Sequence, residues 1–132
     1  MKGDDIANRL LDQAVGCLRL AAELETNPIG KHIARQLIRC STSGGANYEE
    51  ARSAESSDDF AHKASIAGKE VGETVYWLKV TQRAAVTRSS EIAGLINEGE
   101  QLVRILGASA RTARGRGLTK RGDEPRALPT NR

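Results

Sequence analysis

Apolar residues recur every three or four positions along most of the first 107 residues, and no stretch alternates with the two-residue period of a strand. This spacing places the apolar side chains on one face of a helix. Turn and capping signals interrupt the pattern at three places. We therefore predict four amphipathic helices, at residues 5–25, 28–53, 57–85 and 91–107.

Residues with known capping roles stand at the predicted helix boundaries. Asn27 is a preferred N-cap, and Pro28 suits the first position of a helix. Ser56, followed three residues later by Asp59, forms a variant of the capping box. Gly107 is typical of the position just after a helix C-terminus. The connections between the predicted helices are therefore short.

Four helices with short connections and no strand pattern predict an all-α fold, an up-down-up-down antiparallel four-helix bundle. We assign residues 1–109 to this one domain. Residues 110–132 lack apolar periodicity and combine glycine and proline with basic residues, so we predict that they form a disordered basic tail. In the first helix, the residues expected to face the core are Ile6, Leu10, Ala14, Cys17 or Leu18, and Ala21.

The segment 36–78 contains all four aromatic residues of the chain and a run of small residues that ends at Asn47. Gly44 and Gly45 fall inside the helical pattern, where each glycine costs about 1 kcal/mol relative to alanine. We therefore expect a neighbouring helix to approach most closely there. Tyr76 and Trp77 lie beside the apolar stripe of the third helix, and this wide face indicates a contact between subunits.

The same segment resembles the bacterial four helix bundle protein family, whose founding members are encoded in intervening sequences of large-subunit ribosomal RNA genes. The order and spacing of short elements over 43 residues support the resemblance, which weakens in the first and fourth helices and is absent from the tail. The matching residues are Gln36, Leu37, Arg39, Ser43, Asn47, Tyr48, Glu50, Ala51, Ser56, Phe60, Lys69, Glu70, Glu73, Thr74, Tyr76, Trp77 and Leu78.

The resemblance implies a self-associating protein. Relatives form ring- or barrel-shaped pentamers, so a homo-oligomer, and by resemblance a pentamer, is expected. One related group, the accessory variability determinants of diversity-generating retroelements, works with a reverse transcriptase and binds nucleic acid. A reverse transcriptase is therefore an expected partner if this chain comes from a retroelement.

Length and composition are consistent with a single soluble domain. The beginning of the sequence lacks a hydrophobic signal segment, and no apolar run approaches the roughly 20 residues needed to span a bilayer. We therefore expect a cytoplasmic protein without a membrane partner. In that compartment Cys17 and Cys40, both on apolar helix faces, are expected to be buried reduced thiols.

Glu70 and Glu73 lie one turn apart on the third predicted helix, and paired carboxylates can bind metal or transfer protons. A di-iron bundle, however, also needs Glu-x-x-His pairs, and the sequence has none. We interpret the two glutamates as partners of polar groups on the second helix, such as Asn47 or Arg39, or on a second subunit. The alternative is a metal-dependent enzyme that uses Glu50 together with Glu70 and Glu73.

The remaining polar residues do not form a recognisable catalytic pattern. His32 and His62 stand apart from any candidate nucleophile, and the sequence has no phosphate-binding loop or zinc spacing. The run Ser41-Thr42-Ser43 is better explained by helix packing than by catalysis. Asn47 is interpreted as a buried polar residue that fixes helix register, in preference to a ligand-binding amide. We therefore expect neither enzymatic activity nor a metal or other cofactor.

Charge is distributed unevenly along the chain. Residues 111–132 carry a net charge of +5, and the rest of the chain carries −2. Within the basic part, residues 111–121 have no acids or aromatic rings. Such a basic segment favours electrostatic binding to RNA or DNA phosphates, but it also fits a solubilising tail or an adaptor that binds an acidic protein. The candidate nucleic-acid-binding residues are Arg111, Arg114, Arg116, Lys120 and Arg121, followed by Arg35 and Arg39 on the second helix.

Overall fold

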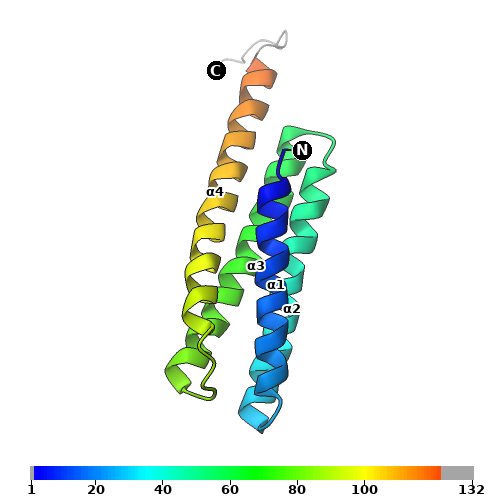
Figure 1. Cartoon of the computed structure of the whole chain (residues 1–132). Helices are drawn as coiled ribbons and strands as arrows, with labels where there is room; N and C mark the ends of the chain where they lie inside the picture. The colour runs from blue at the N-terminus through cyan, green and yellow to red at the C-terminus, as the bar shows by residue number, and fades with distance from the viewer. Residues whose placement is uncertain (1, 123–132) are drawn as a thin grey trace, which may run out of the picture.

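Four α-helices make up the fold, and the prediction of an all-α four-helix bundle is confirmed. The computed structural model describes residues 2–122, with side chains as far as Leu118. The helices are α1 (Asp4–Leu24), α2 (Pro28–Arg52), α3 (Ser57–Ala84) and α4 (Ile92–Gly122). Consecutive helices run antiparallel, and α4 extends beyond the other three at one end (Figure 1).

Contacts between helices follow the chain order. Helix α2 packs against α1, α3 against α2, and α4 against α3, whereas the contact between α1 and α4 is the smallest of the four contacts between neighbouring helices. The bundle is therefore closed less tightly between α1 and α4 than between consecutive helices. This difference leaves room for a pocket, described below.

The predicted capping residues act at the ends of the helices. Asn27 accepts a hydrogen bond from the amide of Gly30 at 2.8 Å, and Ser56 accepts one from Asp59 at 3.0 Å. Gly30 is required at the turn between α1 and α2, because a Cβ atom there would overlap the carbonyl oxygen of Leu24. These three local features fix the two short connections on either side of α2.

The predicted end of the fourth helix at Gly107 is wrong, because α4 continues to Gly122. Residues 110–122, predicted to be disordered, are helical. The reason is tertiary packing: Ala110 and Ala113 are 1% and 4% exposed and pack against small residues of α3. Alanine also has the highest helix propensity. The remainder of the predicted tail, residues 123–132, lies outside the described residues.

The core of α1 also differs in part from the predicted stripe. Leu10, Cys17 and Ala21 are buried as expected, but Leu18 is 39% exposed. Leu20 and Leu24, which the predicted stripe did not include, are also buried. The predicted apolar face of α1 is therefore correct for most of its residues. Of the adjacent positions 17 and 18, Cys17 faces the core.

The two cysteines are free and buried in the core. Removal from water raises the pKa of the Cys17 thiol to about 12, and burial also raises the pKa of Cys40. At neutral pH both side chains therefore remain protonated and pack as small apolar groups.

The small-residue segment of α2 lies close to α3. A Cβ atom on Gly44 would lie 2.9 Å from a methyl group of Val71 and 3.7 Å from the carbonyl oxygen of Ala67. A Cβ on Gly45 would meet the Cβ of Leu10 in α1 at 3.7 Å, which is ordinary van der Waals contact. The close approach expected from the sequence therefore occurs at Gly44 and not at Gly45.

This difference makes Gly44→Ala and Gly45→Ala a matched pair. Alanine gains about 1 kcal/mol of helix propensity at either position. At Gly44 the stiff side chain of Val71 must move, and overpacking of this kind costs about 1–3 kcal/mol. We expect Gly45→Ala to raise the free energy of unfolding and Gly44→Ala to lower it by about 1 kcal/mol relative to wild type.

Thermal unfolding followed by circular dichroism measures both effects. Gly44→Leu should lower the melting temperature further than Gly44→Ala, because more atoms must fit beside Val71. Equal melting temperatures for the two alanine variants would show that the contact between α2 and α3 is looser than the structure indicates.

Candidate functional site

A charged cluster joins α2 to α3. Arg39 pairs with Glu73 and, at 3.5 Å, with Glu70. The indole nitrogen of Trp77 donates a second hydrogen bond to Glu73 at 3.2 Å. The hydrogen bond from Arg39 is the main cause of the lowered pKa of Glu73. Glu73 is therefore held ionised by two donors, which suits a fixed structural contact.

The other polar candidates of this region lie apart from the cluster or have different partners. Asn47 donates to the carbonyl oxygen of Ser43 at 2.9 Å, one turn earlier in α2. Glu50 pairs with Lys63 at 3.1 Å. Within residues 2–122, no three His, Cys, Asp or Glu side chains come close enough together to hold a metal ion. The structure thus does not bring Glu50, Glu70 and Glu73 together.

The aromatic residues expected at a subunit contact form a row beside this cluster. Tyr76 is 58% exposed, and its ring packs edge-on against Trp77 with ring centroids 5.2 Å apart. His32 of α2 also contacts Trp77 edge-on, with ring centroids 5.6 Å apart. Trp77 itself is half-buried and packs on the core. Tyr76 is therefore the more accessible of the two rings.

A second exposed apolar surface lies on α1. Leu11, Val15 and Leu18 are exposed and follow one another at spacings of four and three residues, so they share one face of the helix. On α2, Ile38 is also exposed and shares a face with Gly45, which borders α1. We call these four residues the α1/α2 apolar patch. Large exposed apolar patches are typical of interaction sites.

The basic residues at the end of α4 lie on two faces of the helix. Arg104, Arg111 and Arg114 are exposed and spaced by seven and three residues, which places them in one row. Arg114 also donates a hydrogen bond to Ser65 of α3 at 2.8 Å. Arg116 lies on a different face and lines the pocket described below. Lys120 and Arg121 belong to α4, but their side chains are not described.

The two α2 candidates for nucleic-acid binding differ in their surroundings. Arg35 is exposed. Arg39 is engaged by Glu70 and Glu73, which neutralise its charge. Neither residue lies on the helix that bears the basic row, so the structure does not unite α2 and α4 candidates in one basic surface.

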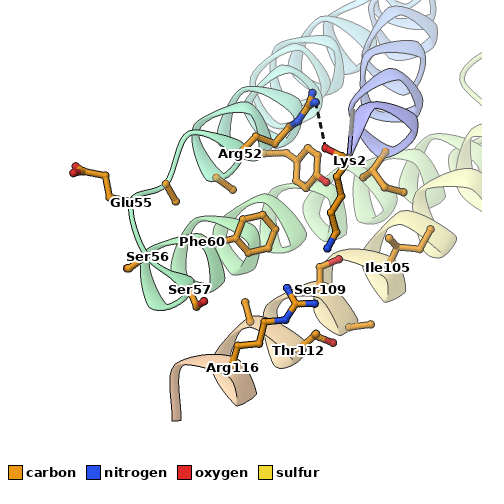
Figure 2. Close-up of a pocket in the computed structure, with 17 residues that line it drawn as sticks. Lys2, Arg52, Glu55, Ser56, Ser57, Phe60, Ile105, Ser109, Thr112 and Arg116 are labelled. Atoms are coloured by element: carbon orange, nitrogen blue, oxygen red, sulfur yellow. Dashed lines mark hydrogen bonds between the residues drawn. The ribbon is translucent and has the colours of Figure 1, made fainter. Parts of the chain in front are cut away.

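A pocket of about 890 Å³ opens at the end of the bundle where α4 extends beyond α1. Its walls come from the beginning of α1, the connection between α2 and α3, and the second half of α4 (Figure 2). It is lined by Lys2, Gly3, Ile6, Tyr48, Ala51, Arg52, Ala54, Glu55, Ser56, Ser57, Phe60, Ile105, Ala108, Ser109, Thr112, Ala113 and Arg116.

Two aromatic rings form the apolar side of this pocket. Tyr48 is almost fully buried, and Phe60 is half-buried against it, edge to face, with ring centroids 6.4 Å apart. Gly3 has a φ of 88°, a left-handed conformation that favours glycine, and a Cβ there would lie 2.9 Å from the Tyr48 hydroxyl. The chain thus enters α1 in close contact with this ring.

The cations around the pocket differ in how they are paired. Arg52 binds Asp4 and, at 3.3 Å, Glu49, so its charge is compensated. Lys2 and Arg116 are exposed, and both point toward the part of the pocket near Ser109 (Figure 2). Of the lining residues, Glu55 alone has a carboxylate, and it points away from this space (Figure 2). The pocket therefore offers positive charge beside an apolar surface.

Polar contacts between α1 and α4 close the bundle below the pocket. Arg9 makes two hydrogen bonds to Glu98, at 2.7 and 2.8 Å, and a third to Gln101 at 3.1 Å. Gln13, which is buried, donates to the carbonyl oxygen of Leu95 at 3.0 Å. The hydrogen bond from Arg9 is the main cause of the lowered pKa of Glu98. These contacts fix the distance between the two helices at the base of the pocket.

Sequence reasoning identified Phe60 and Tyr48 as important rings and Arg116 as a basic residue, but did not place them together. Lys2, Ser109 and Thr112 were not singled out. The pocket could not be found while residues 110–122 were taken as disordered, because α4 supplies one of its walls. Ala110 and Ala113 are spaced for one helix face, and this spacing was the available signal that α4 continues.

Residues 6–108 match the protein family described as 23S rRNA-intervening sequence protein. The chain belongs to this family. A solved member of the S23 ribosomal protein family from Bacteroides thetaiotaomicron, described as a protein with unknown function, is 30% identical to it. The similarity covers 76% of this chain and 94% of that one, with a TM-score of 0.69. No curated protein matches the chain.

The match to the 23S rRNA-intervening sequence protein family includes α1, α2, α3 and the first half of α4. It ends before Arg111, Arg114 and Arg116, so these basic residues lie outside the matched range. None of the helices within residues 2–122 has the length and apolar character required to cross a membrane.

The contact between Arg9 and Glu98 predicts a specific pH dependence. Because the folded-state pKa of Glu98 is lowered, its stabilising contribution is present above the ordinary carboxyl pKa of 4.5 and is lost as the pH falls through the lowered value. We expect Glu98→Gln to reduce stability at pH 7 by up to about 1 kcal/mol, because the pair is partly exposed. The difference from wild type should shrink toward pH 3.

Urea unfolding at pH 7, 5 and 3 measures this difference. Glu100→Gln is a suitable control, because Glu100 pairs with Lys79 at the exposed surface between α3 and α4. A difference between wild type and Glu98→Gln that stays constant down to pH 3 would contradict the assigned role of Glu98.

Proposed function

We propose that this chain is a non-enzymatic, self-associating helical bundle that binds RNA phosphates through the second half of α4. The observation that carries the proposal is the charge of this segment. Residues 101–122 contain six basic residues and no acidic one, whereas the rest of the chain has a net charge of −3. A basic surface of this kind attracts nucleic-acid phosphates without reading sequence.

The shape of the bundle supports this proposal. Helix α4 projects past the other helices, so its end is accessible from several sides (Figure 1). Arg104, Arg111 and Arg114 form an exposed row along one face. Cations near a helix C-terminus also stabilise the helix itself, so stability and binding must be measured separately. The family name refers to an intervening sequence of 23S rRNA, which makes RNA the first nucleic acid to test.

Self-association is supported by the α1/α2 apolar patch. Its members Leu11, Val15, Leu18 and Ile38 are exposed in the single chain, and burial against a second copy would remove them from water. Assembly would also bring several α4 helices to one RNA strand and raise the local concentration of weak phosphate contacts. The resemblance to pentameric relatives makes five copies the expected number.

Replacing the α4 row tests RNA binding. Each phosphate contact contributes about −0.7 to the dependence of log affinity on log salt concentration for single strands. We expect a combined Arg104→Gln, Arg111→Gln and Arg114→Gln variant to bind mixed-sequence single-stranded RNA more weakly, with a salt slope flatter by about 2. Fluorescence anisotropy at several salt concentrations measures both quantities.

The matched control removes three exposed charges at the other end of the bundle, by Lys31→Gln, Arg83→Gln and Arg88→Gln. It should keep the wild-type slope. An equal loss in both variants would show that only net charge matters. If the wild-type protein does not bind RNA at low salt, the proposal is wrong, and an adaptor for an acidic protein takes its place.

A charge in the α1/α2 apolar patch tests self-association. Leu18 is exposed in the single chain, so Leu18→Glu should leave its fold intact. In an interface the same carboxylate would be buried without a partner, which is unfavourable. We expect wild type to be oligomeric at micromolar concentration and Leu18→Glu to dissociate at least about tenfold more readily. Light scattering and sedimentation equilibrium measure the mass.

Ile29→Glu is the control, because Ile29 is 62% exposed but lies outside the patch. Tyr76→Glu and Trp77→Ala test the face on α3 that the sequence favoured. Dissociation by these two variants and not by Leu18→Glu would move the interface to α3. A monomeric wild type would exclude self-association at this concentration.

A further inference from the structure

The pocket beside α4 has the size of a small-molecule site. Its volume of about 890 Å³ lies within the roughly 300–1,000 Å³ typical of ligand sites. It is an open pocket at the end of the bundle, and it lies away from the charged cluster of Arg39, Glu70 and Glu73. A ligand could therefore enter without movement of the helices.

One side of the pocket suits a flat ring. Phe60 is half-buried and is held by its edge-to-face contact with Tyr48, which is itself buried. Ile6 and Ile105 add apolar surface to the lining of the pocket. Each of the nucleobases has a π face that can stack on such a ring, so stacking does not depend on which base is present.

The other side suits an anion. Lys2 and Arg116 come from the two ends of the described chain and point toward the same space, where Ser109 adds a hydroxyl donor (Figure 2). Among the described residues neither cation has an ion-pair partner. Two like charges repel each other, so an anion between them is favourable. Arginine is well suited to phosphate, because its guanidinium presents several donors in one plane.

We propose that this pocket binds a single unstacked nucleotide. The base stacks on Phe60, and its phosphate lies between Lys2 and Arg116. A lipid tail would suit the apolar side but not the hydroxyls of Ser109 and Thr112, whereas a nucleotide uses both. A base inside a duplex cannot enter, so the pocket favours single strands over duplexes.

The nucleotide can be free or part of a strand. For a strand, the inference rests on the RNA binding proposed above, with the α4 row holding neighbouring phosphates. For a free nucleotide it is independent of that proposal, because Arg116 and Lys2 do not belong to the row. The two sources share one chemistry and are separated by the choice of probe.

Calorimetric titration of the full chain with 5′-AMP, adenosine and inorganic phosphate tests the ligand class. We expect 5′-AMP to bind with saturation, and adenosine and phosphate to bind at least about tenfold more weakly, because each lacks one half of the ligand. Phe60→Leu, which keeps an apolar side chain, should weaken 5′-AMP about tenfold. Arg116→Gln should weaken it by a similar factor, and Arg88→Gln, at the opposite end, should leave it unchanged.

A single-stranded RNA with 2-aminopurine at one position tests whether a base within a strand enters the pocket. Its fluorescence should change on binding to wild type and much less on binding to Phe60→Leu. Binding of 5′-AMP without this change supports the pocket and assigns a free nucleotide as its ligand. Because Phe60 also packs on Tyr48, circular dichroism must show that Phe60→Leu is folded, and exposed Arg116 provides a second variant that does not touch the core.

Phosphate and 5′-AMP of equal affinity would overturn the inference, because the base would then contribute nothing. So would wild-type affinity for 5′-AMP in both Phe60→Leu and Arg116→Gln. RNA binding with a steep salt slope but no response from 5′-AMP or 2-aminopurine would overturn the pocket and leave the proposed function intact. Saturable 5′-AMP binding without any RNA binding would support the pocket and contradict the proposed RNA binding.

Discussion

The close packing of small residues between α3 and α4 determines the shape of the functional end of this molecule. Ala110 and Ala113 contact Ala61 and Ala64, and side chains this short allow the two helix backbones to approach. Without this contact, the glycine- and arginine-rich sequence after Gly107 would have little reason to remain helical. With it, the arginines are held at fixed spacing on a rigid helix, and one wall of the pocket exists.

Helix α1 is held in a different way. Its contacts with α4 are few, and beside the shared core they include polar ones, with Arg9 and Gln13 on one side and Glu98 and the Leu95 carbonyl on the other. Such contacts depend on direction and distance more than apolar packing does. They join the helices midway and leave them apart near Lys2 and Ser109. The same bundle is thus tightly packed around α3 and open between α1 and α4.

Helix boundaries with strong local capping signals could be predicted from the sequence. Helix ends that depend on packing between helices could not. Asn27 and Ser56 identified the helix starts, and the glycines of α2 indicated a close approach. The end of α4 was missed because alanine contributes little to an apolar pattern, although its burial there is nearly complete. Phe60 was recognised as a motif residue, but its neighbours Lys2 and Arg116 are separated from it by 58 and 56 positions, and only the folded chain brings them together.

The beginning of α1, which carries Lys2, and the end of α4, which carries Arg116 and the basic row, lie at one end of the bundle. The connections between α1 and α2 and between α3 and α4 lie at the other end (Figure 1). This polarity has a practical meaning for handling the protein. An affinity tag fused ahead of Lys2 or after α4 would crowd the pocket and the basic row and could suppress the behaviour under study. A dye or surface anchor attached in the connection at residues 85–91 would leave that end exposed to solution and would orient every immobilised molecule the same way.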